Sequence, residues 1–330
     1  MKRKKQSVIT NKQPMKVQFK FNTENGEIND KTMTNIDNNK KRIKLLIGMT
    51  YHPIKIQNWE HYLNTANNSF VKRYEDDGKS LMKKNDLTFM KTLAEGKYTK
   101  VMLVSKEGQN ELFALKIFDK EKIIKRNLAK QIVMQKQILK SIRFPFALYL
   151  EGYFQDNSNL YFVMPFLVGG NFLNLLQIYQ RFSESFVRFY MAQVLLALEY
   201  LHFINIIYRD LKPENIMLDH NGFIKLIDFS FAKILKNNRT YTYCGTTDYI
   251  APEFFHLQGY GKSIDWWSFG VVIYELCSGF TPFTNVDESV IIDNISMGKF
   301  KLPESFSINL KDLIRNLLQT DITERLGCLH

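Results

Sequence analysis

The stretch YRDLKPEN at residues 208–215 decides the fold, because a carboxylate, an ammonium group and a carboxamide stand close together in it. Each of these side chains alone would be an ordinary loop residue. The chain carries further short motifs on both sides of this stretch: FALKIF at 113–118, DFS at 228–230, APE at 251–253, DWWSFG at 265–270 and TERLG at 323–327. The order and spacing of the whole set are far more specific than any single motif.

In that order and at that spacing, the motifs resemble those of protein kinases, from Leu87 to the end of the chain. Longer stretches such as YTYCGTTDYIAPE are similar to the AGC group of Ser/Thr kinases, and most of all to catalytic subunits of cAMP-dependent protein kinases. The resemblance implies an α+β fold of two lobes: a small β-rich N-lobe with one key helix at 87–164, and a large helical C-lobe at 170–330. The chain ends at His330, and we expect a kinase domain (87–330) truncated before the family's last helix and C-terminal tail.

Hydrophobic periodicity predicts where the elements lie. Apolar residues at helical spacing predict an amphipathic helix over 57–78, and the basic stretch 1–56 before it is expected to be a disordered tail. Alternating apolar residues predict three strands between 87 and 118, followed by a helix over 122–142. Two strands around an Asp-Asn-Ser-Asn turn are expected within 153–166. Long apolar helices are predicted over 184–203 and 263–279.

The resemblance implies a phosphotransferase that uses ATP and Mg²⁺. Phosphoryl transfer needs negative charge neutralised and a nucleophile aligned, which explains the residue types. Asp210 would accept or orient the proton of a substrate hydroxyl, and Lys212 would lie against the γ-phosphate. Asp228 and Asn215 would be the oxygen ligands of Mg²⁺. The implied catalytic set is Asp210, Lys212, Asn215 and Lys116. The implied ATP-binding set is Leu93, Gly96, Val101, Ala114, Lys116, Met164, Leu167, Met217 and Asp228.

Further matches concern regulation and protein substrates. Thr242 matches an activation-loop phosphorylation site, and Arg209 and Lys233 stand where cations would meet its phosphate. Glu214 and Glu275 match residues that bind an arginine two positions before the target hydroxyl, so basic-motif protein substrates are expected. The implied regulatory set is Thr242, Arg209, Lys233 and Gln135, and the implied substrate-binding set is Glu214, Glu275 and Thr246. A cAMP-binding regulatory subunit is a further implied partner.

The chain departs from the family pattern at positions that bear on activity. The glycine-rich loop keeps only Gly96, with Ala94 and Thr99 at the other glycine positions, and we expect weaker nucleotide handling from this. Gln135 stands where a glutamate would pair with Lys116, which removes one charge from that contact. Two hypotheses follow: an active ATP-dependent Ser/Thr kinase, favoured because the charge-handling residues are all present, and a pseudokinase that acts as a binding or scaffold module.

Other positions concern structure and specificity. Glu253 and Arg325 match a structural ion pair of the large lobe. Ser230 replaces the glycine after Asp228 and Phe229. Asn171 replaces a glutamate that reads a basic residue three positions before the target, which weakens the expected basic preference. Gln131 replaces a histidine that would reach the activation-loop phosphate.

Composition limits the remaining function classes. The 330 residues are 45% hydrophobic and 24% charged, as in ordinary globular proteins. No apolar run reaches the roughly 20 residues of a membrane span, and Lys2 excludes N-myristoylation.

The net charge is +12, and residues 1–44 hold twelve Lys and Arg against four Asp and Glu. This tail alone would suit nucleic acid, but aromatic residues do not alternate with its charges in a stacking pattern, so no nucleic-acid binding is expected. Three widely spaced cysteines (Cys244, Cys277 and Cys328) indicate a reduced protein of the cytoplasm, with the nucleus as the alternative location.

Overall fold

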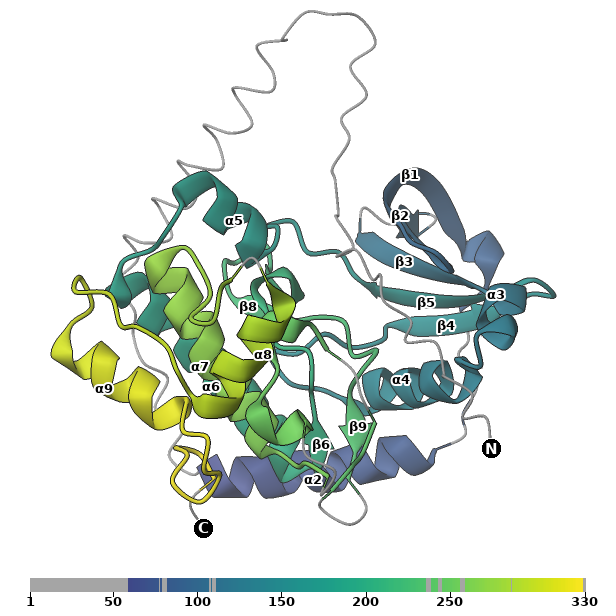
Figure 1. The fold of residues 1–330 in the computed structure, drawn as a ribbon. Helices are drawn as coiled ribbons and strands as arrows, with labels where there is room; N and C mark the ends of the chain where they lie inside the picture. Colours follow the sequence, from purple (N-terminus) through teal and green to yellow (C-terminus); the bar gives the residue numbers. More distant parts are fainter. Residues whose placement is uncertain are drawn as a thin grey trace, which may run out of the picture.

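The computed structural model describes residues 59–76, 78, 82–106, 108, 111–235, 239–242, 245–255, 259–285 and 287–328. They form a small lobe built on a β-sheet and a larger lobe of helices, which lie side by side in Figure 1. The predicted two-lobed α+β fold is therefore confirmed. The predicted tail, residues 1–56, and Cys244 lie outside the described residues. No helix in the described part of the chain is long and apolar enough to cross a membrane.

The small lobe is a five-stranded antiparallel sheet in the order β1-β2-β3-β5-β4. Its strands are β1 (Leu87–Glu95), β2 (Thr99–Lys106), β3 (Leu112–Asp119), β4 (Gly152–Gln155) and β5 (Asn159–Pro165). Successive side chains of a strand point to opposite faces. One face of the sheet packs Val104, Phe113, Leu115, Tyr161 and Val163 into an apolar cluster of its own. The other face carries Phe118, Phe162 and Met164, which belong to the core shared with the large lobe.

The segment after β3 differs from the prediction of one helix over 122–142. The structure has two helices there, α3 (Lys120–Lys125) and α4 (Ala129–Ser141). Between them Asn127 has a φ of 54°, a left-handed conformation that cannot continue a right-handed helix. The Asp119 side chain accepts a hydrogen bond from the Lys122 backbone N–H at 3.0 Å and fixes the start of α3. The break leaves α4 a separate helix beside the sheet (Figure 1).

The large lobe is built around two mostly apolar helices. Its helices are α5 (Phe172–Tyr179), α6 (Glu184–Phe203), α7 (Ser263–Ser278), α8 (Glu288–Met297) and α9 (Ile308–Leu317). The bounds of α6 are those predicted from the sequence. Helix α7 ends one residue before the predicted 279, because Gly279 takes a left-handed φ of 93°. Both helices bury residues on most of their circumference, which explains their weak amphipathic pattern.

Two short ribbons hold the central motifs together. Strand β6 (Ile206–Ile207) pairs with β9 (Lys233–Ile234), and β7 (Ile216–Leu218) pairs with β8 (Ile224–Leu226). The stretch 208–215 runs from β6 to β7, and the stretch 227–232 runs from β8 to β9. The two ribbons therefore fix these loops against each other at both ends.

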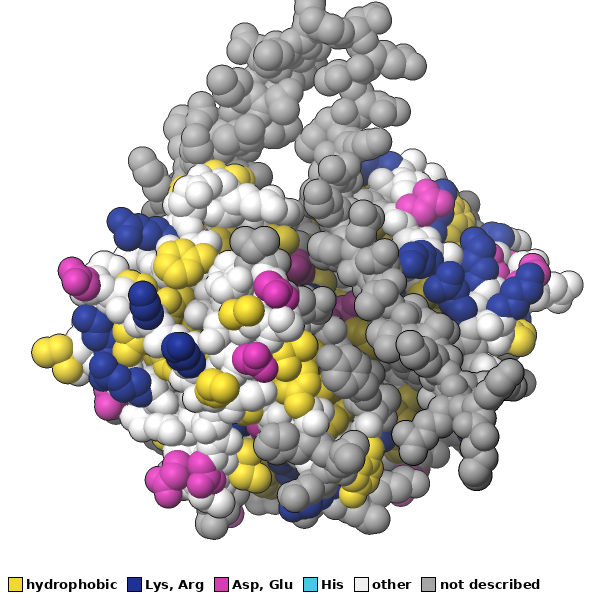
Figure 2. Space-filling view, viewed as in Figure 1, with side chains coloured by type: hydrophobic (Ala, Val, Ile, Leu, Met, Phe, Trp, Pro, Cys, Tyr) yellow, Lys and Arg dark blue, Asp and Glu magenta, His cyan; other side chains and the backbone are white. Residues whose placement is uncertain are grey.

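Helix α2 (Trp59–Glu75) lies within the predicted range 57–78 and runs along the base of both lobes in Figure 1. Trp59 and Tyr62 contact the ring of Phe144, with centroid distances of 6.2 Å each. Near its other end, Arg73 Nε donates to the backbone oxygen of Ser141, the last residue of α4, at 2.8 Å. On the face seen in Figure 2, Lys and Arg side chains are interspersed with Asp and Glu.

Candidate active site

Asp210 is the centre of a connected polar group. Its Oδ1 lies 3.2 Å from Lys212 Nζ, and its Oδ2 accepts a hydrogen bond from Asn215 Nδ2 at 2.7 Å. The backbone oxygen of Asp210 accepts from the same nitrogen at 2.7 Å. Burial raises the pKa of the Asp210 carboxyl above its ordinary value, although the nearby Lys212 ammonium works against this. A fixed carboxylate of increased basicity is suited to accept a proton.

The backbone of this loop is held by a buried carboxylate from α7. Asp265 is 0% exposed and accepts hydrogen bonds from the backbone N–H groups of Tyr208, at 2.9 Å, and Arg209, at 2.8 Å. His202 Nε2 lies 2.8 Å from the same carboxylate. Arg209 has a φ of 69°, so these bonds hold a strained residue next to Asp210. The motif DWWSFG contains Asp265, but the sequence does not show that it positions the loop.

Asp228 and Lys116 bring the large lobe and the small lobe together. Lys116 Nζ, on β3, lies 3.2 Å from Asp228 Oδ1. Burial alone would raise the pKa of Asp228, but the Lys116 charge and the hydrogen bonds from Lys116 and Ser230 outweigh it and leave the pKa below its ordinary value. Asp228 has a φ of 53°, a conformation that few non-glycine residues adopt. This carboxylate is therefore ionised at neutral pH and held in a specific orientation.

The donor set of Asp228 and Asn215 fits a Mg²⁺ ion bound together with phosphates. The amide nitrogen of Asn215 is used by Asp210, which leaves its Oδ1 for another partner. An ionised carboxylate and an amide oxygen are hard ligands of the kind that Mg²⁺ prefers. The described residues contain no group of three or more His, Cys, Asp or Glu that could hold a metal ion. Phosphate oxygens and water would thus have to supply the remaining ligands.

The residues predicted to bind the nucleotide lie largely on one face of the small-lobe sheet. Val101 pairs with Lys116 across β2 and β3, and Ala114 pairs with Met164 across β3 and β5. Directly opposed residues of antiparallel strands share a face, so these side chains form one surface beside Lys116. Leu93 lies on β1 and Gly96 in the β1–β2 turn, Leu167 follows β5, and Met217 lies on β7, where it bridges to Asn171. Whether these residues bind a nucleotide stays a prediction.

The β1–β2 turn requires less conformational freedom than the sequence suggested. The backbone N–H of Gly96 donates to the Thr99 oxygen at 2.7 Å and closes the turn. Gly96 is not one of the described glycines with a positive φ. Its backbone conformation is thus open to other residues, and only a close approach of phosphate to the turn would require glycine there.

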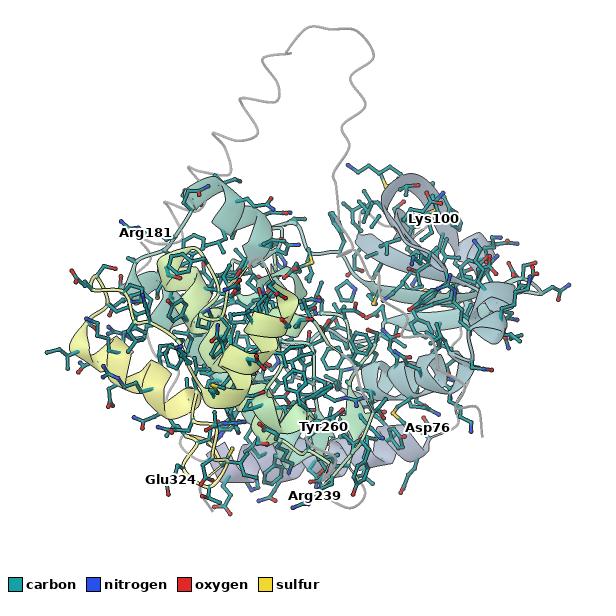
Figure 3. All side chains as sticks on the ribbon, viewed as in Figure 1. Asp76, Lys100, Arg181, Arg239, Tyr260 and Glu324 are labelled. Carbon is teal, nitrogen blue, oxygen red and sulfur yellow. The ribbon has the colours of Figure 1, made fainter. Side chains whose placement is uncertain are left out.

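Arg209 and Lys233 both connect to the segment that carries Thr242. Arg209 Nη1 donates to the hydroxyl oxygen of Tyr260 at 2.9 Å, and that hydroxyl donates to the backbone oxygen of Thr242. Lys233 Nζ donates to Thr240 Oγ1 at 2.8 Å. The Thr242 side chain is exposed and so accessible to a modifying enzyme. Tyr260, which Figure 3 labels in the lower part of the large lobe, is not among the predicted site residues, because no sequence motif links it to Arg209.

Glu275 and Glu214 form a partly satisfied acidic pair, and Thr246 lies beside the central group. Glu275 is 7% exposed and accepts a hydrogen bond from the Tyr249 hydroxyl at 2.6 Å. Burial raises the pKa of Glu275 to about 7; the charges of Glu214 and Asp248 add to this, and the Tyr249 hydrogen bond opposes it. Glu214 Oε2 is buried and accepts no hydrogen bond from the described residues. Thr246 Oγ1 accepts from Lys212 Nζ at 2.9 Å.

Two of the three glutamines of α4, Gln131 and Gln135, differ in their contacts. Gln135 is 2% exposed, and its Oε1 has no hydrogen-bond partner among the described residues. Lys116, which sequence analysis paired with Gln135, bonds to Asp228. The role of Gln135 stays a prediction. Gln131 Nε2, in contrast, donates to the backbone oxygen of Ser230 at 2.7 Å, a contact that sequence analysis missed.

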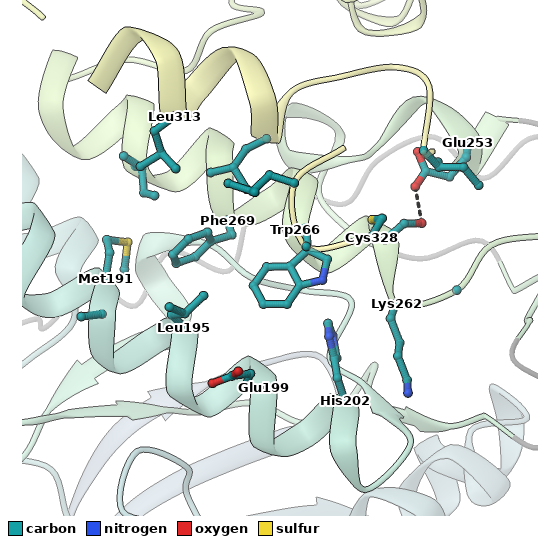
Figure 4. Close-up of a pocket in the computed structure, with 18 of the residues that line it drawn as sticks. Met191, Leu195, Glu199, His202, Glu253, Lys262, Trp266, Phe269, Leu313 and Cys328 are labelled. Carbon is teal, nitrogen blue, oxygen red and sulfur yellow. Dashed lines mark hydrogen bonds between the residues drawn. The ribbon is translucent and has the colours of Figure 1, made fainter. Parts of the chain in front are cut away.

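A separate groove of about 1470 Å³ lies in the large lobe. Figure 4 shows Met191 and Leu195 of α6 facing Trp266 and Phe269 of α7 across it, with Leu313 of α9 nearby. None of the predicted site residues lines this groove. It therefore lies apart from the candidate site.

Known proteins are similar in sequence to this chain over about three quarters of its length. Residues 87–330 match the model of the protein kinase domain. The chain is 43% identical over 246 residues to cAMP-dependent protein kinase type 3 of Saccharomyces cerevisiae, covering 74% of this chain and 62% of the relative. It is 42% identical over 244 residues to the cAMP-dependent protein kinase catalytic subunit of Schizosaccharomyces pombe (74% and 48%), and 40% identical over 249 residues to the serine/threonine-protein kinase Sgk1 of Fundulus heteroclitus (74% and 58%). The chain thus matches between about half and two thirds of the length of these relatives.

Proposed function

Because this chain belongs to the protein kinase family, we propose that it is an ATP-dependent protein kinase that transfers the γ-phosphate of ATP to Ser or Thr hydroxyls of proteins. The observation that carries the proposal is the presence of two ion pairs, Lys116 with Asp228 and Lys212 with Asp210. They supply the cations and carboxylates that phosphoryl transfer requires, held by two loops that the ribbons fix in place. The similar proteins named as cAMP-dependent kinases and Sgk1 support the same reaction class.

The reaction follows from the charges of these side chains. The Asp210 carboxylate accepts the proton of the substrate hydroxyl. The hydroxyl oxygen forms a bond to the γ-phosphorus, and the bond between the γ-phosphorus and the bridging oxygen of the β-phosphate breaks. Lys116 and Lys212 neutralise phosphate charge before and during transfer. Asp228 and Asn215 would hold Mg²⁺, which would supply further neutralisation of the phosphate charge. Asn215 also keeps Asp210 in position through its two hydrogen bonds.

The alternative of a pseudokinase is weaker. It rests on Ala94, Thr99 and Gln135, and none of these substitutions removes a group that the mechanism uses to move a proton or to hold a metal. Ala94 and Thr99 flank a turn that closes with its hydrogen bond in place. The relatives are named as protein kinases, which gives no support for this alternative.

Direct transfer is the test of the proposed function. The full chain, incubated with Mg²⁺ and ATP labelled on the γ-phosphate, should phosphorylate a serine peptide that carries arginines. Asp228→Ala should reduce phosphate transfer to the level measured without protein. This variant lacks the carboxylate that pairs with Lys116 and that would bind Mg²⁺. A peptide with alanine in place of the serine is the control for acceptor identity. If the unmodified protein binds ATP but transfers no more phosphate than Asp228→Ala, the proposal is wrong and the pseudokinase alternative stands.

The substrate class follows from the acidic pair. Glu214 Oε2 is buried without a hydrogen bond from the described residues. The charge of Glu214 also contributes to the raised pKa of Glu275. A buried carboxylate oxygen without a donor is unfavourable, and an arginine guanidinium would satisfy both carboxylates. Basic-motif protein substrates are therefore the proposed class, with Thr246, bonded to Lys212, next to the acceptor hydroxyl.

Affinity for such substrates is expected to rise with pH. Because the pKa of Glu275 is about 7, this carboxyl is mostly neutral at about pH 6 and mostly ionised at about pH 8. The KM for a peptide with arginine two positions before the target serine should fall about tenfold over this range, in proportion to the ionised fraction. A peptide with citrulline at that position, which is neutral and of similar shape, is the control. Glu275→Gln should remove the pH dependence. An equal pH dependence for both peptides would contradict this assignment.

Regulation is proposed at Thr242. A phosphate there would add about −1.5 to −2 charge beside the segment that Arg209 and Lys233 already contact.

A cAMP-binding regulatory subunit is the proposed protein partner, since similar proteins are named as catalytic subunits of cAMP-dependent kinases. The cytoplasm is the proposed location, with the nucleus as the alternative that the basic tail suggests.

A further inference from the structure

The backbone that follows Asp228 is held from two sides. Gln131 Nε2, on α4 of the small lobe, donates to the oxygen of Ser230 at 2.7 Å. Arg209 Nε, on the loop of the large lobe that carries Asp210, donates to the oxygen of the next residue, Phe231, at 2.6 Å. Two successive carbonyl groups are thus bound by side chains from different lobes. This segment begins two residues after Asp228, whose φ of 53° needs external support.

Helix α4 therefore reaches the candidate site through Gln131. At Gln135, one helical turn further along, Oε1 has no hydrogen-bond partner in the described part of the chain, and the Lys116 ammonium bonds to Asp228. Positions four residues apart lie on the same helix face, so both glutamines point toward the same side of α4. Of these two glutamines, only Gln131 forms a hydrogen bond, among the described residues, to the segment that follows Asp228.

We propose that Gln131 is a positioning residue for phosphoryl transfer, an inference that rests on the proposed function. Its amide holds the Ser230 carbonyl against α4 and so keeps the Asp228 carboxylate directed at Lys116 and at Mg²⁺. The contact joins a neutral amide to a backbone carbonyl, and neither group changes its charge when Thr242 is phosphorylated. The Gln131 contact therefore does not itself respond to a phosphate at Thr242, whose proposed cationic partners are Arg209 and Lys233.

Two substitutions remove the donor and keep the size of the side chain. Gln131→Met has no hydrogen-bonding group, and Gln131→Glu places an acceptor against the Ser230 oxygen. Loss of a hydrogen bond of this kind corresponds to about a 2- to 12-fold change, so kcat should fall about 3- to 10-fold in Gln131→Met and further in Gln131→Glu. The KM for the peptide should stay within about twofold, because Gln131 contacts no proposed substrate residue. Lys130→Ala, an exposed position next to it on α4, is the matched control and should retain full activity.

The independence from Thr242 is tested by a double-mutant cycle. Gln131→Met should lower kcat by the same factor in the native background and in Thr242→Ala, because independent effects multiply. A Gln131 effect that disappears in Thr242→Ala would overturn the proposed independence. All rates are measured well below the melting temperature of each variant, so that unfolding does not contribute to the loss.

Hydrogen exchange separates a failure of this inference from a failure of the proposed function. Backbone amides of residues 228–232 should exchange faster in Gln131→Met than in Lys130→Ala, whether or not the protein transfers phosphate. If the native protein is inactive but this difference is present, the proposed function is wrong and the contact stands as a structural one. If the native protein is active, and Gln131→Met matches it in kcat and in exchange, the positioning role is overturned.

Discussion

Asp210→Asn is expected to lower kcat by about 10²- to 10⁴-fold, the range attributed to a positioned general base. Asparagine has nearly the same shape, and it can still face Asn215 and Lys212, but it cannot accept a proton at the oxygen that lies 3.2 Å from Lys212 Nζ. Burial has already raised the pKa of this carboxyl, so the loss removes a base of increased strength. The KM values for ATP and peptide should change much less than kcat, because the group acts mainly in the transition state.

The matched control is Asp219→Asn in the turn between β7 and β8. Asp219 Oδ1 accepts hydrogen bonds from the backbone N–H groups of Asn221, at 2.9 Å, and Phe223, at 3.0 Å. An asparagine oxygen can accept the same bonds, so full activity is expected. Initial rates of transfer at saturating ATP and peptide measure both variants. If Asp210→Asn kept more than about a tenth of the native kcat, Asp210 would not be the proton acceptor, since even the weakest expected effect is about 10²-fold.

Arg325→Ala is expected to have the largest effect on stability, about 3–5 kcal/mol, because it leaves the buried Glu253 carboxylate with the Ser263 hydroxyl but without its cationic partner. Arg325 is 0% exposed, and its Nη1 and Nη2 donate to the two oxygens of Glu253 at 2.6 and 2.8 Å. The guanidinium also donates to the backbone oxygens of Gln319 and Ser263, at 2.9 and 3.1 Å. It lies 5.1 Å from the ring centroid of Trp267. The substitution therefore breaks bonds to three separate segments.

Thermal unfolding measures this effect. A loss of about 3–5 kcal/mol in a domain of this size should lower the melting temperature by about 6–20 °C. Arg315→Ala, an exposed arginine on α9, is the control and should change stability by less than about 0.5 kcal/mol. The double variant Glu253→Gln with Arg325→Ala should be less destabilised than the sum of the two single variants, since the unpaired carboxylate is then absent. Additive losses would show that the pair is not coupled.

Sequence motifs predicted the positions of the charged groups but not how they are held. Asp210, Lys212 and Asn215 lie within one loop, so their proximity follows from short spacing, and the contact of Lys116 with Asp228 adds only one long-range pairing. The hydrogen bond of Gln131 to Ser230 and the bridge of Tyr260 from Arg209 to Thr242 join residues far apart in the chain. Such contacts use backbone oxygens or common polar side chains, and these leave no signature in one sequence.

Element types were predicted better than element ends. The predicted run 184–203 matches α6 at both ends: Ser183 accepts a hydrogen bond from the Phe186 N–H as its N-cap, and beyond the last helical residue Asn205 has a left-handed φ of 57°. The division between α3 and α4 was missed because it depends on the φ of Asn127, a residue that helices tolerate at moderate cost. Tertiary packing, which the local pattern does not contain, decides such a break.

The two ribbons β6–β9 and β7–β8 have a consequence for how this site can vary. Each ribbon ties one end of the Asp210 loop to one end of the Asp228 loop, so both loops start and end at the same pair of anchored positions. One added residue in either loop is expected to shift Asp210 or Asp228 relative to its partners. We therefore expect this site to tolerate replacement of side chains better than a change of loop length, whereas the turn between β7 and β8 lies outside the tied segments.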